Sequence, residues 1–387
     1  MTRVLFVTNG HGEAAIAERI AIELQSIMPD VRLDHLALVG DPSGAVVEEV
    51  GPRRAMPSGG LIAMGNVRNL TKDLRAGLLA LSWAQASFLR GARGSYGLAV
   101  VVGDAYALAM TLLMRTRTVF VGSAKSVEVA PYGVVEEWLL RRAAARFVRD
   151  EATARVLREH GLTVEPAANA IVDLFETPDD SSVTRAVDGF VPVLALFPGS
   201  RESAYENAEL LLEITREIAA SSSTIGAVLS IARGLEAERF AAVAQRAGWQ
   251  VRATTDESVP FVLSRDGREI VRSWRGALGP LLARVTLVLG QAGTANEAAA
   301  AAGVPVIAFE GDRDRKARWY RQRQRGLLGD ALAVFPSRLD EAVAGVRSIL
   351  EDPKRQAHMR ATGRARMGEA GGARRIAERV ASLVAKS

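Results

Sequence analysis

Short runs of apolar and β-branched residues alternate with helix-like segments along the whole chain, and this alternation restricts the possible folds more than any other feature. The strand-like runs are residues 4–8, 31–38, 98–102, 118–121 and 145–148, then 191–197, 225–231, 250–253, 269–271, 286–289 and 304–309. Strands that alternate with helices form parallel βαβ units, in which helices cover both faces of a sheet. The sequence therefore predicts an α/β fold whose second half repeats the architecture of the first.

The length of the chain predicts two domains. It has 387 residues, and a single hydrophobic core rarely grows beyond about 250–300 residues. Residues 173–188 are polar and rich in turn-forming residues, which indicates a boundary there. We expect an N-terminal domain over residues 1–178 and a second domain over 189–362. The tail, 363–387, is helical beyond a Gly-Gly break and is long enough to cross back to the first domain.

Composition excludes several classes of protein. Because the chain has no cysteine, disulfides, thiol nucleophiles, iron–sulfur clusters and Cys-type zinc sites are excluded. The N-terminal residues pass directly into a β-like run, without the apolar segment and cleavage site of a signal peptide, and no stretch is apolar enough to span a bilayer. We therefore expect a cytoplasmic protein. The net charge of +5 is mild and suits an anionic lipid or nucleotide. We expect no nucleic-acid partner, although a non-catalytic basic module remains an alternative.

A glycine loop follows the first strand and opens a helix. Residues 10–15 fit the dinucleotide pattern G-x-G-x-x-G/A, with Asp34 placed further on as a ribose ligand, so an NAD-dependent oxidoreductase is one alternative. However, Glu13 in the first helical turn would compete with a pyrophosphate for the N-terminal N–H groups. The loop suits a hydroxyl-bearing substrate better, and a glycine turn without a ligand is a further alternative.

Two polar residues follow the first and third strands of the first half. His11 lies in the loop after residues 4–8, and Asp104 follows residues 98–102. The carboxyl ends of strands in an open α/β sheet line the crevice where ligands bind. If these strands are neighbours, Asp104 can orient the His11 imidazole as a general base, or Asp104 can itself be the base. The structural alternative is that Asp104 caps the following helix.

The first strand of the second half ends in a turn suited to an anion. The turn contains Gly199, Ser200 and Arg201, and it precedes a predicted helix. A hydroxyl, a guanidinium and backbone N–H groups at a helix N-terminus form a cradle for a phosphorylated ligand. A capping serine beside a solvated arginine is the alternative.

Residues 287–298 combine a buried strand, a glycine loop and an alanine-rich helix. The N–H groups after Gly293 are suited to a diphosphate, and the Glu297 carboxylate is suited to both hydroxyls of a ribose. A capping box between Thr294 and Glu297 is the structural alternative.

Two other segments are notable, one for its basic residues and the other for its apolar residues. Residues 313–325 are strongly basic and include Trp319 and Tyr320, which suits phosphate, an acidic membrane or a solvated helix face. Residues 61–89 fit either an interfacial segment or a core helix. Asp312 and Asp314 form a D-x-D flanked by basic residues, and we expect no metal there. The absence of P-loop, H-E-x-x-H, G-x-S-x-G and kinase signatures excludes ATPases, zincins and hydrolases of those types.

Three of these runs together resemble lipid-A-disaccharide synthase and, more closely, the lipid-A-disaccharide synthase-related proteins. They are Asn9-Gly10-His11-Gly12-Glu13, Phe197-Pro198-Gly199-Ser200-Arg201 and Ala292-Gly293-Thr294 to Glu297. Supporting similarity comes from Ala63-Met64-Gly65, from residues 121–126, which include Lys125, and from residues 169–173. The resemblance spans most of the chain.

The resemblance implies a GT-B-type glycosyltransferase, with two Rossmann-like domains facing a central cleft and a C-terminal helix that crosses back. It implies metal-independent, inverting transfer from a UDP-sugar to a lipid or other hydrophobic acceptor, with no other cofactor. We also expect peripheral contact with an anionic membrane at the inner face of the plasma membrane. A nucleotide-sugar epimerase on the same fold is the nearest alternative.

The predicted site residues fall into three groups. The catalytic group is His11, Asp104 and Glu13. The donor-binding group is Gly199, Ser200, Arg201, Gln291, Gly293, Thr294, Asn296 and Glu297. The acceptor-side group is Asn9, Gly10, Gly12, Met64 and Lys125.

Overall fold

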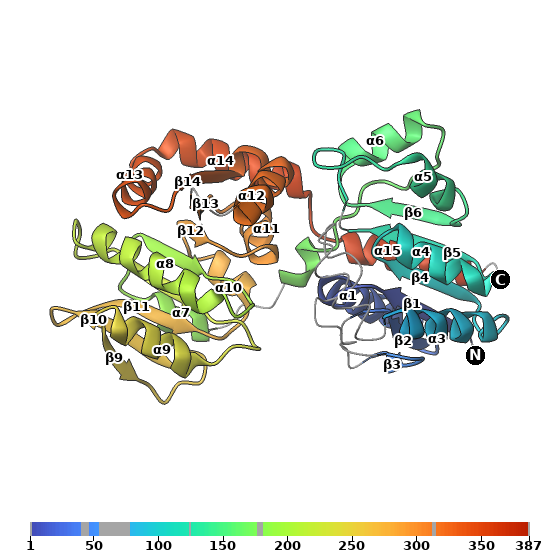
Figure 1. Ribbon diagram of the computed structural model, residues 1–387, viewed down its shortest axis with the longest axis horizontal. Helices are drawn as coiled ribbons and strands as arrows, with labels where there is room; N and C mark the ends of the chain where they lie inside the picture. Colours follow the sequence, from blue (N-terminus) through green and yellow to red (C-terminus); the bar gives the residue numbers. More distant parts are fainter. Residues whose placement is uncertain are drawn as a thin grey trace. The chain divides into compact units, whose positions relative to one another are not determined.

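The chain divides into two α/β units (Figure 1). The computed structural model describes residues 2–39, 46–53, 78–123, 125–175, 181–311 and 315–385. Unit 1 comprises Met1–Leu174 together with Glu369–Ser387, and unit 2 comprises Phe175–Gly368. The chain thus enters unit 2 after residue 174 and leaves it after residue 368, compared with expected transitions after residues 178 and 362.

Unit 1 is built on a parallel six-stranded sheet with the order β3-β2-β1-β4-β5-β6. Its elements are β1 (Arg3–Thr8), α1 (His11–Ile27), β2 (Arg32–Ala37), β3 (Glu48–Glu49), α3 (Leu78–Gly91), β4 (Leu98–Val102), α4 (Ala105–Thr111), the 3-10 turn η1 (Leu112–Met114), β5 (Thr118–Gly122), α5 (Val134–Leu140), β6 (Ala145–Val148), α6 (Glu151–Glu159), η2 (Val172–Phe175) and α15 (Gly372–Val384).

Helices cover both faces of this sheet. Successive side chains of a strand point to opposite faces, and Leu5, Val7 and Val101 belong to one buried cluster with Leu89 of α3 and Leu108 of α4. The alternate strand residues are also buried, on the face where α1 and α15 pack. The first and third predicted strands, β1 and β4, are direct neighbours in parallel register.

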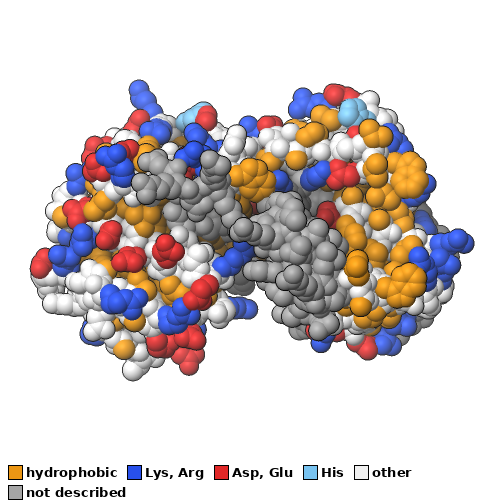
Figure 2. Space-filling view, in the orientation of Figure 1, with side chains coloured by type: hydrophobic (Ala, Val, Ile, Leu, Met, Phe, Trp, Pro, Cys, Tyr) orange, Lys and Arg blue, Asp and Glu red, His pale blue; other side chains and the backbone are white. Residues whose placement is uncertain are grey.

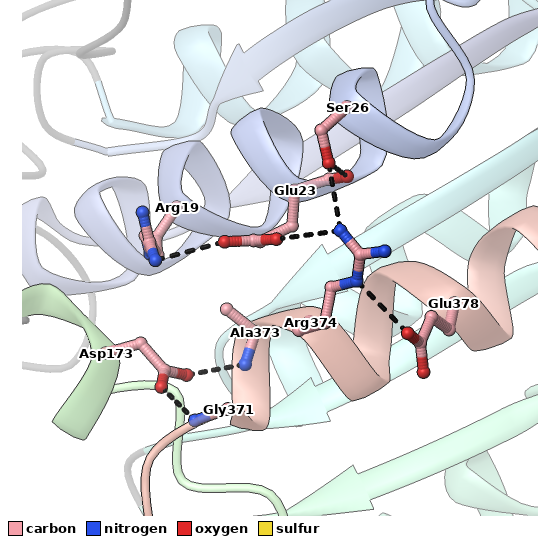
Figure 3. Close-up of polar contacts among 8 residues, drawn as sticks. All are labelled: Arg19, Glu23, Ser26, Asp173, Gly371, Ala373, Arg374 and Glu378. Carbon is pink, nitrogen blue, oxygen red and sulfur yellow. Dashed lines mark hydrogen bonds and ion pairs between the residues drawn. The ribbon is translucent and has the colours of Figure 1, made fainter.

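The C-terminal helix α15 belongs to unit 1, as the crossing-back helix requires. The buried Asp173 carboxylate accepts hydrogen bonds from the backbone N–H groups of Gly371 and Ala373, both at 2.5 Å (Figure 3). Arg374 then contacts Glu23 and Ser26 of α1. A carboxylate at a helix N-terminus satisfies N–H groups that have no intrahelical acceptor. Asp173 therefore fixes the point where the tail re-enters unit 1.

Unit 2 is built on an eight-stranded sheet with the order β14-β13-β12-β7-β8-β11-β10-β9. Its elements are α7 (Ser182–Val187), β7 (Val193–Phe197), α8 (Ala204–Ala219), β8 (Gly226–Ser230), α9 (Ala237–Arg246), β9 (Gln250–Ala253), β10 (Phe261–Arg265), β11 (Arg268–Trp274), α10 (Leu278–Leu282), β12 (Leu287–Gly290), α11 (Thr294–Ala301), β13 (Val306–Glu310), α12 (Arg315–Leu328), η3 (Gly329–Ala331), β14 (Leu332–Pro336), α13 (Leu339–Leu350) and α14 (Pro353–Met367).

This sheet is not the fully parallel one that the alternating pattern predicts. Strands β14 to β11 are parallel, but β10 is antiparallel to both β11 and β9. A two-residue turn joins β10 to β11, and its residues Asp266 and Gly267 have φ values of 50° and 76°. Positive φ at both positions is the requirement of the tight hairpin turn that favours Asp-Gly. The hairpin lies between β8 and the edge strand β9, away from β7 and β12.

Among the described residues, none of the helices has the length and apolar character that crossing a bilayer demands.

We predict that Asp173→Ala loosens α15. A buried N–H group, that of Ala373, and a partly buried one, that of Gly371, lose a charged acceptor. This loss costs about 2 kcal/mol and makes the amides of α15 exchange roughly 30-fold faster. Hydrogen-exchange mass spectrometry of residues 372–384 measures this. Asp173→Asn keeps one carbonyl oxygen and should show a smaller effect, and the exposed Asp30→Ala serves as the control. Equal exchange in the Asp173→Ala and Asp30→Ala proteins would contradict the capping role.

Candidate functional site

In unit 1, the loops after β1 and β4 meet at the carboxyl edge of the sheet. Thr8 pairs with Val102, so Asn9 and Gly103 begin adjacent loops. The Asn9 amide donates a hydrogen bond to Oδ1 of Asp104 at 2.7 Å. Gly103 has a φ of 154°, and the Asn9 side chain occupies the space where a Cβ would lie. The structure therefore brings Asn9 and Asp104 together.

Asp104 also caps α4, as the structural alternative predicts. Its Oδ1 accepts hydrogen bonds from the backbone N–H groups of Tyr106 at 3.0 Å and Ala107 at 3.1 Å. Burial raises the pKa of Asp104, and the bonds from Ala107, Tyr106 and Asn9 oppose that rise. Because Oδ1 accepts all three bonds, Asp104 as a general base would have to act through Oδ2.

The structure describes some of the other predicted site residues of unit 1 and not others. Helix α1 begins at His11, with Gly10 at its N-cap, and the Glu13 carboxylate lies against Gly10. Gly12 is exposed in the first turn. The side chain of His11, like Met64, lies outside the described part of the structure, so the pairing of His11 with Asp104 stays a prediction.

Lys125 follows β5 at the same edge of the sheet. Its ammonium forms an ion pair with Glu136 at 2.5 Å and donates to the carbonyl of Pro131. The Glu136 carboxylate also accepts the N–H of Gly133 at the start of α5. This contact holds Lys125 against α5, and its acceptor role remains a prediction.

Asp34 does not lie where a dinucleotide would need it. It is fully buried in β2, beside Leu5 of β1, and bonds Arg3 and the hydroxyl of Tyr96. A ribose-binding carboxylate should stand at the carboxyl end of β2, next to the glycine loop. Asp34 lies toward the amino end of that strand, which argues against the NAD alternative.

In unit 2, the predicted loops after β7 and β12 lie side by side. Phe197 pairs with Gly290, and the N–H of Gln291 donates to the carbonyl of Phe197 at 2.8 Å. Gly199 has a φ of 117°, a value that suits glycine, and the carbonyl of Pro198 accepts from Asn207 of α8. Two of the predicted anion-binding runs therefore share one edge of one sheet.

Ser200 and Arg201 are exposed, but they do not stand at the helix start itself. Helix α8 begins at Ala204, and a turn separates it from these two residues. Burial raises the pKa of Tyr320, whose hydroxyl lies against Gly293, and the positive charge of Arg201 partly opposes that rise. The pairing of Phe197 with Gly290 places the Arg201 turn at the same edge of the sheet as the loop of residues 291–293.

Helix α11 begins directly after that loop. Gly293 is its N-cap, and no side chain caps it, so the capping box between Thr294 and Glu297 is wrong. The first N–H groups of a helix have no intrahelical acceptor and attract anions. Glu297 lies in this first turn. Burial raises the pKa of Tyr320, and the charge of Glu297 adds to that rise.

Asn296 is completely buried and supports the loop from behind. Its amide donates to the carbonyl of Gly290 at 3.1 Å and to Oε1 of Gln324 at 3.3 Å. Asn296 therefore supports the predicted donor-binding loop and does not itself face a ligand.

Sequence reasoning did not single out Arg321 and Gln324 as site residues. Both are buried on the inner face of α12, although the segment reads as a basic, solvated helix. Their spacing of three residues, together with Leu328 one turn further on, is the available signal for a buried face.

An exposed apolar face covers the α3, α4 and α5 side of unit 1. Its members with the most exposed side chains are Leu79 (71%), Trp83 (73%), Val134 (85%), Val135 (71%) and Trp138 (52%). Helix α4 contacts both α3 and α5, and Figure 2 shows apolar side chains gathered over this part of unit 1. The Arg142 guanidinium stacks on the Trp138 ring at 3.3 Å. We call this surface the α3–α5 face.

Among the described residues, no cluster of His, Asp or Glu could hold a metal ion. The D-x-D of Asp312 and Asp314 lies outside those residues.

Comparison with known proteins identifies the fold. No protein-family model and no curated protein matches the sequence. A Listeria monocytogenes structure, described as a candidate UDP-N-acetylglucosamine 2-epimerase, matches with a TM-score of 0.63 and 14% identity, over 100% of this chain and 97% of that one. A Neisseria meningitidis UDP-GlcNAc 2-epimerase bound to UDP-GlcNAc has a TM-score of 0.55 and 13% identity, over 98% and 100%.

A Polygonum tinctorium UDP-glucosyltransferase capable of glucosylating indoxyl has a TM-score of 0.58 and 15% identity, over 100% of this chain and 99% of that one. At such identities the likeness concerns the fold alone. The chain therefore has a two-domain α/β fold, as the alternating pattern predicts, and it is of the GT-B type that the resemblance implies.

We predict that Asp104→Ala destabilises the protein by about 1–2 kcal/mol, because α4 loses its cap. Asp104→Asn keeps Oδ1 as an acceptor and should lose less. Asp150→Ala, which removes the cap of α6, is a matched control. Urea unfolding measures all three, and an Asp104→Ala protein as stable as wild type would contradict the role.

The pH dependence follows from the raised pKa of Asp104. A carboxyl whose pKa is higher in the folded than in the unfolded state loses stability on ionising. The stability of Asp104→Asn relative to wild type should therefore rise as the pH increases above the ordinary carboxyl range.

Proposed function

We propose that this protein is a UDP-sugar-dependent glycosyltransferase that transfers a sugar, with inversion and without a metal, to a lipid or other hydrophobic acceptor. One observation carries the proposal. In unit 2, the exposed Arg201 turn and the uncapped N-terminus of α11 adjoin at the carboxyl edge of the sheet. In open α/β sheets this edge is where ligands bind.

The donor diphosphate would bind at this edge. Arg201 and Ser200 would contact its oxygens, together with the N–H groups of Gly293 and Thr294. Glu297, one turn into α11, would accept hydrogen bonds from the ribose hydroxyls. Because Gly199 has no side chain, the backbone of the turn after β7 would be free to approach the phosphates.

The acceptor would react at the carboxyl edge of unit 1. His11 oriented by Asp104, or Asp104 alone, would take the proton of the acceptor hydroxyl, whose oxygen forms the new bond to the anomeric carbon. The bond from that carbon to the diphosphate oxygen breaks, and attack from the opposite side inverts the configuration. Arg201 and the α11 N–H groups would stabilise the growing charge on the diphosphate. Glu13, Asn9, Gly10 and Gly12 would shape the acceptor side.

The α3–α5 face supports the hydrophobic character of the acceptor. A soluble surface rarely exposes two tryptophans with neighbouring valines and leucine unless something binds there. Aromatic side chains with adjacent arginines suit the interface of an anionic membrane. We therefore propose that unit 1 contacts an anionic lipid surface through the α3–α5 face.

A nucleotide-sugar epimerase is the second candidate, and the names of two of the similar structures favour it. An epimerase converts a UDP-sugar without an acceptor.

We predict that UDP raises the melting temperature of the protein and that NADH does not, because a ligand stabilises only the state that binds it. Arg201→Ala should weaken UDP binding about tenfold, whereas Arg246→Ala, an exposed arginine of α9, should not. A protein that UDP leaves unchanged would contradict the proposal.

The reaction itself is assayed with UDP-GlcNAc and UDP-glucose. Release of UDP that requires an added polar-lipid extract supports transfer, whereas conversion of the UDP-sugar without any acceptor supports epimerisation. Asp104→Asn keeps the cap but cannot take a proton at the carboxylate, so its turnover should fall by about a hundredfold or more if Asp104 is the base.

We also predict binding to vesicles of phosphatidylglycerol and phosphatidylcholine. Trp83→Ser with Trp138→Ser should lower the bound fraction about tenfold, because both side chains leave the interface. Trp319→Ser, an exposed tryptophan of α12, is the matched control. If only the Trp319 variant loses binding, α12 is the membrane surface instead.

A further inference from the structure

Arg321 of α12 is a buried cation directly behind the loop of residues 291–293. It is 5% exposed, and its guanidinium donates to Oε1 of Gln324 at 2.9 Å and to Oε1 of Gln291. Its Nε–H is buried without a hydrogen-bond partner. Within the part of the chain that the structure describes, Arg321 forms no ion pair with a carboxylate.

The two glutamines connect Arg321 to the loop backbone. The Gln324 amide donates to the carbonyls of Ala292 at 3.0 Å and Gly293 at 3.3 Å. The Gln291 amide donates to the carbonyl of Phe309 at the end of β13. These hydrogen bonds satisfy the inward-facing carbonyls of the loop and hold the start of α11 in place.

A buried arginine without a carboxylate partner is energetically unfavourable in the free protein. Removing a charge from water costs several kcal/mol unless an opposite charge compensates it. Burial lowers the pKa of Arg321, and Tyr320 and Glu310 only partly oppose this. Two neutral glutamine oxygens satisfy hydrogen-bonding groups but not the net charge. An anion at the outer side of the loop would compensate it.

We propose that Arg321 is a positioning residue for the donor diphosphate: it fixes the loop of residues 291–293 through Gln291 and Gln324 and supplies positive charge from behind it. The inference rests on the proposed function, since it takes the diphosphate to bind at this loop. Arg321 would then contribute to the binding of the charged diphosphate and not to the binding of the base or the sugar.

The test compares ligands of different charge. Isothermal titration measures the binding of UDP, UMP and uridine to wild type, Arg321→Gln, Arg321→Lys and Arg325→Gln, in which Arg325 is an exposed arginine of the same helix. Arg321→Gln should weaken UDP binding about ten- to a hundredfold and uridine binding by less than about threefold. Arg321→Lys, which keeps the charge, should retain most of the UDP affinity, and Arg325→Gln should behave as wild type.

Each other outcome overturns one claim. If Arg321→Gln loses UDP and uridine equally, Arg321 holds the loop only, and the electrostatic role is wrong. If Arg321→Gln fails to fold, the Arg321→Lys protein is used in its place. A folded Arg321→Lys protein that loses UDP binding and uridine binding equally would likewise show that the electrostatic role is wrong. If wild type binds none of the three ligands, the proposed function fails, which is distinguishable from a failure confined to Arg321.

Discussion

The parallel pairing of β12 with β7 is the constraint on which the candidate donor site depends. It sets Gly290 opposite Phe197 and lets the N–H of Gln291 extend the ladder by one bond to the carbonyl of Phe197. Both loops then leave the sheet at one edge. A shift of the register would separate the Arg201 turn from the start of α11, although each turn would keep its local conformation. The sequence of each loop determines its shape, and the strand pairing determines that they adjoin.

The alternating pattern predicts most of the fold because buried parallel strands are continuous apolar runs. Each predicted strand lies within a few residues of a strand of the structure, whereas the two-residue β3 corresponds to no predicted run. Strand β10 is missed because Phe261–Arg265 precedes a hairpin, not a helix. Its signal is nevertheless in the sequence, since Asp266-Gly267 between two β-like runs is a strong hairpin pattern. Strand β14 is also missed, although Leu332–Pro336 is an apolar run of the same length as β13.

The site is predictable where it lies in loops at strand ends and unpredictable where it depends on burial. The rule that ligands bind at carboxyl ends makes Asp104, Arg201 and Gly293 candidates from their positions after strands. It says nothing of Arg321, which lies mid-helix among exposed arginines. A basic helix in the sequence does not reveal which arginine faces inward, because only the packing of α12 against the sheet decides it. The same limitation explains why Asn296 reads as a ligand contact although it is buried.

Asp104 is placed under two opposing demands on its pKa. It caps a helix, and it is a candidate general base. A helix cap favours the ionised carboxylate, and the bonds from Tyr106, Ala107 and Asn9 therefore lower its pKa. A general base at neutral pH needs a higher pKa than a capping carboxylate usually has. Burial provides the opposing effect and is the larger of the two. Because all three bonds go to Oδ1, capping and proton transfer can use different oxygens of the same carboxylate. The Asn9 side chain, in the loop that follows β1, contributes one of these three bonds and so couples that loop to the pKa of Asp104.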